Sequence, residues 1–130
     1  MGTRIERYKM NKLDKEIVEW SIQTFPDLTV EKQRQKLSEE LREWKQAEDK
    51  EEKIKGLADV YIVSRILADR FDCEIGKFLA EKMLNEACIL EAMGFSDAVE
   101  AKMKKNKARV WEKVSDGTYH HKEAEGGKSA

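Results

Sequence analysis

The chain has 130 residues, 39% of them charged, and its 25 basic and 26 acidic side chains leave a formal net charge of −1. A domain of this length buries about two thirds of the surface that its unfolded chain exposes, so one hydrophobic core is expected. The near balance of charge excludes a global attraction to nucleic acid or to a membrane surface, so any charge-based function must be local.

The sequence carries no recognisable export signal and no cysteine motif for a metal. Residues 1–16 lack the apolar stretch of a signal peptide, and the apolar run at residues 60–63 is too short to span a bilayer. Cys73 and Cys88 form no CxxC pair, and no histidine lies near them at metal-ligand spacing. We therefore expect a cytoplasmic protein with buried, reduced thiols.

The first half of the chain predicts three helices. Helix-favouring residues dominate the composition and the chain has one proline, so we expect an all-α fold. Apolar spacing places helices at residues 11–24, 30–47 and 50–70, and Thr29 and Asp49 are the expected N-caps of the second and third. The third helix is apolar around much of its circumference, which predicts a place at the bundle centre or in a subunit interface.

The second half predicts two more helices. A fourth helix covers residues 74–92 and ends at Gly94, and a fifth covers residues 97–113. The expected architecture is a four-to-five-helix bundle in a single domain over residues 1–115.

The last residues of the chain are polar and rich in glycine. Residues 116–130 are therefore expected to form a flexible C-terminal tail. A substrate-closing role for residues 116–121 is the alternative that we weighed for this segment.

Three acidic residues are candidate ligands of a divalent cation. Glu40 and Glu43 lie one helical turn apart on one face, with about 5–6 Å between their β-carbons. Mg²⁺ prefers oxygen ligands and usually takes only one or two protein carboxylates. Asp59 lies within an apolar run, where a carboxylate needs a metal, hydrogen bonds or a counter-ion. The alternatives are a solvated acidic face for the pair and a structural salt bridge for Asp59.

The fifth predicted helix presents a basic face. Lys102, Lys105, Asn106 and Arg109 are spaced i, i+3, i+4 and i+7, which puts all four on one side of the helix. Arginine offers a planar fork for phosphate oxygens, lysine a mobile charge, and asparagine a neutral donor and acceptor. This face is a candidate polyanion site, and an ordinary solvated lysine face is the alternative.

The motifs occur in an order that is typical of a known family. The segment KLSEELRE at residues 36–43 precedes LADV at residues 57–60 and KMKKNKARVW at residues 102–111. Over residues 16–113 the chain resembles the MazG-like all-α nucleoside triphosphate pyrophosphohydrolases. The resemblance implies Mg²⁺-dependent hydrolysis of (deoxy)nucleoside triphosphates to monophosphate and pyrophosphate, with Mn²⁺ as a substitute metal. It further implies nucleotide-pool house-cleaning by a bundle completed as a homodimer or homotetramer. The balance of charge, in turn, predicts no nucleic acid or membrane partner.

One family position is not matched. The family pairs an ExxE on one helix with an ExxD on the next, and these acids hold the metal. Glu40, Glu43 and Asp59 match three of the four acids, while the position of the fourth is Gly56. A catalytically silent nucleotide-binding or helical protein-interaction module is therefore the alternative function. Two nearby acids are candidate substitutes in the metal site: Glu39 and Glu52.

The resemblance also implies roles for the remaining candidates. One of the three matched carboxylates orients or deprotonates the attacking water, which gives Glu40, Glu43 and Asp59 a catalytic role. The basic face holds the triphosphate, and two residues near the family's nucleotide-facing segment are candidates for base recognition. The implied substrate-binding residues are Lys102, Lys105, Asn106, Arg109, Trp20 and Gln33.

Overall fold

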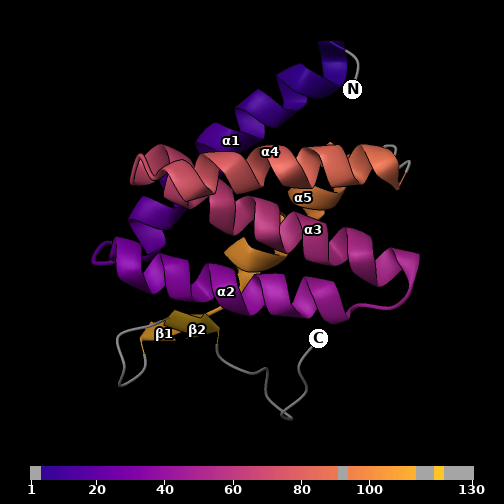
Figure 1. Ribbon diagram of the computed structural model, residues 1–130. Helices are drawn as coiled ribbons and strands as arrows, with labels where there is room; N and C mark the ends of the chain where they lie inside the picture. The colour runs from indigo at the N-terminus through magenta and orange to yellow at the C-terminus, as the bar shows by residue number, and fades with distance from the viewer. Residues whose placement is uncertain (1–3, 91–93, 114–118, 122–130) are drawn as a thin grey trace.

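The computed structural model describes residues 4–90, 94–113 and 119–121, and these are mostly helical (Figure 1). The all-α class expected from the sequence is confirmed, with one short two-stranded sheet in addition. No helix in the described ranges is both long enough and apolar enough to cross a membrane. The elements are α1 (Arg4–Thr24), α2 (Val30–Gln46), α3 (Lys50–Arg65), the π-helical turn η1 (Ile66–Arg70), α4 (Glu74–Ile89), α5 (Phe95–Ala108), β1 (Trp111–Lys113) and β2 (Tyr119–His121).

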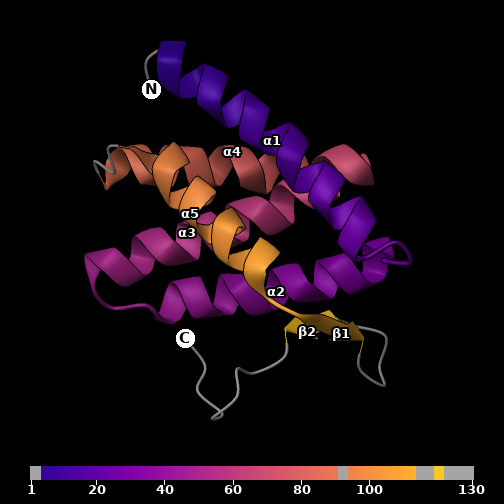
Figure 2. The same cartoon turned by 180° about the vertical axis from the view of Figure 1, so that it is seen from behind.

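The helices form two layers, and α3 is the middle helix of the first layer (Figure 1). In Figure 1, α4, α3 and α2 lie side by side, and Figure 2 shows α1 and α5 crossing the other face of this layer. Leu57, Val60 and Leu67 are completely buried on α3 and η1, and each such side chain contributes about 1.5–3 kcal/mol by leaving water. The hydroxyl of Tyr61 donates to Asp14 over 2.8 Å and so links α3 to α1. The expected central position of the third helix is confirmed.

Helix capping follows the sequence in the first half of the chain. Thr29 accepts a hydrogen bond from the backbone N–H of Lys32, and Asp49 accepts one from Glu52, at 3.2 and 2.8 Å. Each bond satisfies one of the backbone donors that a helix leaves unpaired at its N-terminus. The starts of α2 and α3 therefore agree with the prediction.

Other helix ends differ from the prediction. The first helix begins at Arg4 rather than at residue 11, because Met10 is buried and extends the apolar face. The last helix begins after Gly94, which has a φ of 76°, and ends at Ala108 rather than at residue 113. The backbone becomes extended at Arg109, and the chain continues into β1.

The thiols are less buried than expected. Cys73 is half-buried in the connection before α4, and Cys88 is exposed. Cys88 lies on the outer face of α4, where Phe78 and Ile89 are also exposed. The helix carries more apolar residues than the core can cover, so apolar character alone did not identify the buried face.

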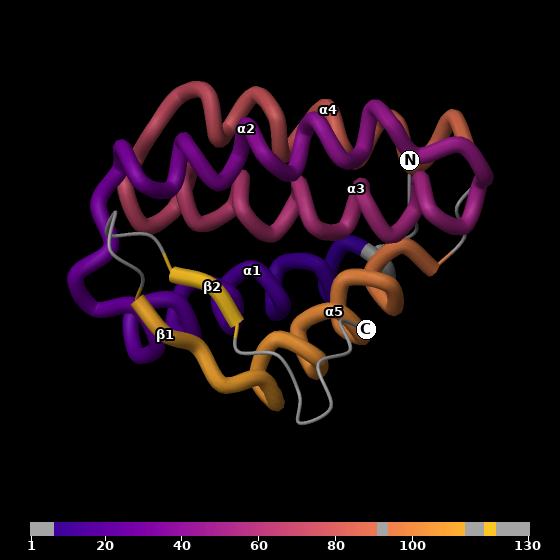
Figure 3. The backbone as a smooth tube through the Cα atoms, turned by 90° about the horizontal axis from the view of Figure 1, so that it is seen from below, coloured from indigo at the N-terminus to yellow at the C-terminus, as the bar shows by residue number. Residues whose placement is uncertain are grey.

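A β-hairpin replaces part of the expected tail. β1 and β2 pair antiparallel, with Trp111 opposite His121 (Figure 3). Lys113 and Tyr119 both donate to the carboxylate of Asp27, in the turn between α1 and α2. Residues 119–121 are thus held against the bundle, while residues 116–118 and 122–130 of the predicted tail lie outside the described residues.

Gly76 allows α4 to approach the junction of α3 and η1. A β-carbon at this position would lie 2.6 Å from Cβ of Leu67 and 2.7 Å from the backbone at Ser64 and Ala68. We expect Gly76→Ala to lower the free energy of unfolding by about 1–3 kcal/mol, because this overpacking involves backbone that cannot yield easily. Urea unfolding followed by circular dichroism measures the change.

Helix propensity alone predicts that Gly76→Ala raises the free energy of unfolding, since alanine stabilises a helix by about 1 kcal/mol relative to glycine. Asn85→Ala on the exposed face of α4 is the matched control, with an expected change within about 0.5 kcal/mol. A Gly76→Ala variant as stable as the parent would show that the two elements are not in close contact.

Candidate functional site

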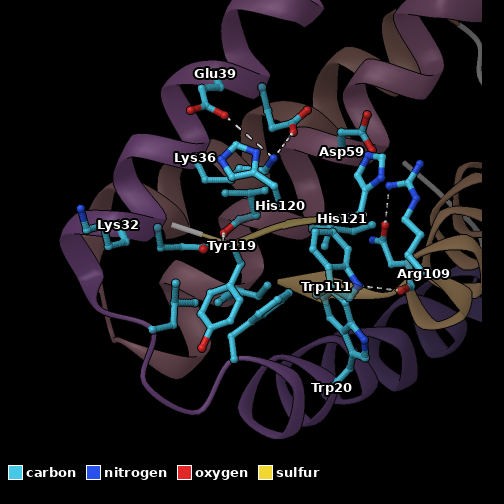
Figure 4. Close-up of a pocket in the computed structure, with 18 of the residues that line it drawn as sticks. Trp20, Lys32, Lys36, Glu39, Asp59, Arg109, Trp111, Tyr119, His120 and His121 are labelled. Carbon is cyan, nitrogen blue, oxygen red and sulfur yellow. Dashed lines mark hydrogen bonds and ion pairs between the residues drawn. The ribbon is translucent and has the colours of Figure 1, made fainter. Parts of the chain in front are cut away.

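Most of the candidate residues line one cavity, formed by α2, α3, α5 and the hairpin, with α1 and the α1–α2 turn at its base (Figure 4). Its volume is about 420 Å³, a size typical of small-molecule sites. Carboxylates, cations and aromatic rings share its surface. The candidates that line it are Trp20, Gln33, Glu39, Glu40, Glu43, Asp59, Lys102, Asn106 and Arg109.

The carboxylates of the cavity come from two neighbouring helices. Glu40 and Glu43 extend from α2 and Asp59 from α3, and Glu39 joins them from α2. The side chain of Glu40 is 13% exposed and that of Asp59 is 22% exposed, whereas Glu43 is exposed. The structure therefore brings the three proposed metal ligands to a common surface.

Two lysines form ion pairs with three of these four acids. The Nζ atom of Lys36 lies 3.4 Å from Oε2 of Glu40 and 3.9 Å from Oε1 of Glu39. The Nζ atom of Lys102 lies 3.2 Å from Oδ1 of Asp59 and connects α5 to α3. The salt bridge that we weighed as an alternative for Asp59 is thus present, at the wall of the cavity rather than inside the core.

Burial leaves the acids with raised proton affinity in spite of these lysines. Burial raises the pKa of Glu40 from 4.5 to about 7, and the negative charge of Asp59 adds to the effect while Lys36 opposes it. Burial also raises the pKa of Asp59, against the lowering effect of Lys102. The two carboxylates therefore form a partly desolvated anionic centre, where a cation is favoured.

Three of the four polar residues predicted on the fifth helix line the cavity, two from α5 and Arg109 from just beyond its end. Asn106 is buried, and its Oδ1 accepts a hydrogen bond from Nη1 of Arg109 over 3.3 Å. Lys102 lies on the same side of α5. Lys105 is exposed and does not line the cavity. The four residues span a wider part of the helix surface than the part that faces the cavity. The structure therefore does not support Lys105 as a substrate contact.

Gly56, at the position where the resemblance implies a fourth acid, lies close to α2. A β-carbon on Gly56 would meet Trp44 at 3.2 Å, so α2 approaches α3 closely at this point. Glu52 is exposed and does not line the cavity, which leaves Glu39 as the closer of the two proposed substitutes. Gln33 lines the cavity, and its side-chain amide donates to the backbone oxygen of Val63 over 3.3 Å.

The carboxylates of the cavity fit a metal site that is completed by water and substrate, and they do not fit a site made of protein ligands alone. Within residues 4–90, 94–113 and 119–121, no group of three or more acidic, histidine or cysteine side chains is arranged to hold a metal ion. An all-protein metal cage does not fit this arrangement. A Mg²⁺ ion that takes one or two carboxylates and completes its shell with water and phosphate does fit.

No family model, curated protein or solved structure matches this chain. Its function is therefore inferred from the cavity and from the order of motifs in the sequence. The sequence-based candidates did not include two lysines of the cavity, Lys32 and Lys36, most of an aromatic wall, or a pair of histidines.

The aromatic wall combines residues far apart in the sequence. The ring of Phe25 lies 5.2 Å from Trp20, 5.1 Å from Trp111 and 4.6 Å from Tyr119, measured between centroids. Arg70 of η1 supports this wall by donating to the backbone oxygen of Phe25 over 2.9 Å. From the sequence, Trp20, Trp44 and Trp111 could each stack on a base, and Trp20 was the one chosen as a candidate. The proximity of Trp111 to the basic motif was the available signal for a second ring.

Two histidines reach the cavity from β2. His120 and His121 both line it, and in Figure 4 their imidazoles project toward the end that holds Lys36, Asp59 and Arg109. The ring of His121 also packs edge-on against Trp111, 5.7 Å between centroids. Of the segment weighed for a substrate-closing role, residues 119–121 line the cavity, and residues 116–118 are outside the described residues.

Proposed function

We propose that this protein is a MazG-like pyrophosphohydrolase that converts (deoxy)nucleoside triphosphates to monophosphate and pyrophosphate in a Mg²⁺-dependent reaction. One observation carries the proposal: the acidic motif, the basic motif and an aromatic wall line the same cavity. A nucleoside triphosphate has the matching parts, a polyanionic chain that needs cations and a flat ring that stacks on aromatic side chains. Removal of unwanted nucleotides is the proposed biological role.

The acidic wall is the proposed metal site. Glu40, Glu43 and Asp59 would hold Mg²⁺, with Mn²⁺ as a substitute and Glu39 nearby on α2. When bound, the ion supplies positive charge that offsets the charge of the triphosphate. One of the three carboxylates also orients the attacking water and accepts its proton. The water oxygen attacks the α-phosphorus, the bond from the α-phosphorus to the bridging oxygen breaks, and pyrophosphate leaves.

The basic wall is the proposed triphosphate clamp. The guanidinium of Arg109 offers two parallel donors to phosphate oxygens, and Lys102 offers a mobile ammonium. Asn106 orients Arg109 through their 3.3 Å hydrogen bond and would bind a phosphate or the sugar. Positive charge here stabilises the negative charge that develops on the leaving pyrophosphate.

The aromatic wall is the proposed binding site for the nucleobase, and the side-chain amide of Gln33 lies at the same cavity. We expect Trp111→Leu to raise KM for nucleoside triphosphates by roughly 10- to 100-fold, because stacking of one base on one ring contributes about 1–3 kcal/mol. Leucine keeps apolar volume next to Phe25 and Trp20 but removes the flat ring. Steady-state kinetics measures the change, and binding of tripolyphosphate, which has no base, is expected to stay the same.

Trp44→Phe is the matched control for this variant. Trp44 packs against Gly56 outside the cavity lining, and among the described residues its indole N–H has no hydrogen-bond partner. Its replacement is therefore expected to leave KM unchanged. Equal losses of nucleotide and tripolyphosphate binding in Trp111→Leu would contradict a base-stacking role.

The second candidate function is a silent module that binds nucleotide or a protein partner without turnover. Gly56 favours it, because a residue without a side chain stands where the resemblance implies a fourth acid, and Trp44 lies close to it. Thermal unfolding with a non-hydrolysable triphosphate separates nucleotide sites from protein-interaction modules. Mg²⁺-dependent stabilisation is expected for a nucleotide site, since a ligand that binds only the folded state raises its stability. An unchanged melting temperature at saturating analogue would reject the proposed function.

A further inference from the structure

Two lysines of the cavity are paired with carboxylates that the proposed function assigns to the metal ion. Lys36 pairs with Glu40 at 3.4 Å and Lys102 pairs with Asp59 at 3.2 Å. The lysines belong to different helices, α2 and α5, and their side chains are 33% and 24% exposed. Two of the three proposed metal ligands, Glu40 and Asp59, are thus paired with the protein's own cations.

The cavity as a whole is internally neutralised. Its acidic and basic side chains, histidines aside, are equal in number. A divalent cation that enters alone is repelled by the lysines, and a polyphosphate that enters alone is repelled by the carboxylates. The acidic residues are Glu39, Glu40, Glu43 and Asp59, and the basic residues are Lys32, Lys36, Lys102 and Arg109.

We propose that Lys36 and Lys102 exchange partners when substrate binds. Their ammonium groups leave the carboxylates of Glu40 and Asp59 for phosphate oxygens, and the freed carboxylates take the divalent cation. The inference rests on the proposed function and adds Lys36 to the substrate-binding residues. Lysine suits such an exchange because its charge sits on a long flexible stem with three donors.

The exchange predicts positive coupling between metal and polyphosphate. Each ligand removes the group that competes with the other, so the two bind more tightly together than separately. A lysine that served only to stabilise the acidic wall would not produce this coupling. Binding measurements, which need no catalytic step, therefore distinguish a lysine that exchanges partners from one that only stabilises the wall.

The test compares binding of Mn²⁺ alone with binding of a preformed Mg²⁺–tripolyphosphate complex, by calorimetry, in the wild type, Lys36→Met and Lys102→Met. Methionine keeps the length of the stem and removes the charge. We expect both variants to bind Mn²⁺ alone about fivefold more tightly, since one competing ion pair of modest energy is removed. We expect both to bind the complex about 10-fold more weakly, since a charge-assisted bond to phosphate is lost.

Lys9→Met is the matched control, because Lys9 forms a 3.3 Å ion pair with Asp97 outside this cavity. It is expected to leave both affinities unchanged. Changes of the same sign for both ligands in Lys36→Met or Lys102→Met, or no change at all, would overturn the exchange. Circular dichroism confirms that each variant is folded.

Failure of the exchange and failure of the proposed function give different results. Opposite changes in the two affinities, without pyrophosphate release from any nucleotide, would support the exchange and reject the enzyme. Pyrophosphate release by the wild type, with unchanged affinities in both lysine variants, would support the enzyme and reject the exchange.

Discussion

Glu40→Gln is expected to stabilise the metal-free protein at pH 8 and to abolish Mg²⁺-dependent turnover. The pKa of Glu40 is raised from 4.5 to about 7, first by burial and then by the charge of Asp59. Glutamine keeps the shape of the side chain but has no charge to bury. Opposite effects on stability and activity are typical of residues retained for function.

The pH dependence follows from the direction of this shift. Below pH 4.5 the carboxyl group is protonated in both the folded and the unfolded chain, and its contribution to stability is complete. As the pH rises to about 7, the unfolded chain ionises first, and the free energy of unfolding falls by up to about 3 kcal/mol. Asp59, whose pKa is also raised, acts in the same direction, while Lys36 opposes the loss.

Urea unfolding in chelator at pH 5, 7 and 8 measures this dependence. The free energy of unfolding of Glu40→Gln is expected to change less with pH than that of the wild type and to be higher than the wild-type value at pH 8. The charged groups that act on Glu40 are Asp59 on α3 and Lys36 and Glu43 on α2. A Glu40→Gln protein less stable than the wild type at pH 8 would show that the carboxylate is needed for the fold.

Glu43→Gln is expected to lower turnover by about 10²–10⁴-fold, the range for loss of a positioned acid or base. Glu43 is exposed and lines the cavity, so its replacement should change the free energy of unfolding by no more than about 0.5 kcal/mol. The loss of activity can then be assigned to chemistry rather than to folding. Initial rates at saturating nucleotide and Mg²⁺, together with urea unfolding, test both parts.

Glu52→Gln is the matched control for Glu43→Gln. Glu52 is also an exposed glutamate, in the first turn of α3, and does not line the cavity. Its replacement is expected to leave turnover and the Mg²⁺ dependence unchanged. A Glu43→Gln variant as active as Glu52→Gln would remove Glu43 from the site.

The sequence predicted those parts of the structure that depend on local pattern. Apolar spacing located the helices, and Thr29 and Asp49 marked two helix starts by their capping chemistry. Asp59 within an apolar run pointed to a carboxylate that needs a partner, and Lys102 provides one. The motif order also placed residues of α2, α3 and α5 at a common cavity, although Lys105 is turned away from it.

The parts that were missed depend on tertiary contacts. The two strands have three residues each, too few to show periodicity, and Asp27 anchors them through Lys113 and Tyr119. This anchor helps to hold β2 where its histidines line the cavity. Lys36 was missed although it lies four residues before Glu40, a spacing that favours an ion pair on a helix. The close approach of Trp44 to Gly56 could not be inferred from either helix alone.

Release of pyrophosphate from a panel of ribo- and deoxyribonucleoside triphosphates, with Mg²⁺ and with chelator, tests the central claim most directly. The account predicts pyrophosphate and monophosphate in equal amounts for at least one nucleotide, no orthophosphate, no reaction with chelator, and a rate lowered by about 10²–10⁴-fold in Glu43→Gln. Orthophosphate and diphosphate as products, or no reaction with any nucleotide by folded protein in the presence of Mg²⁺, would contradict it.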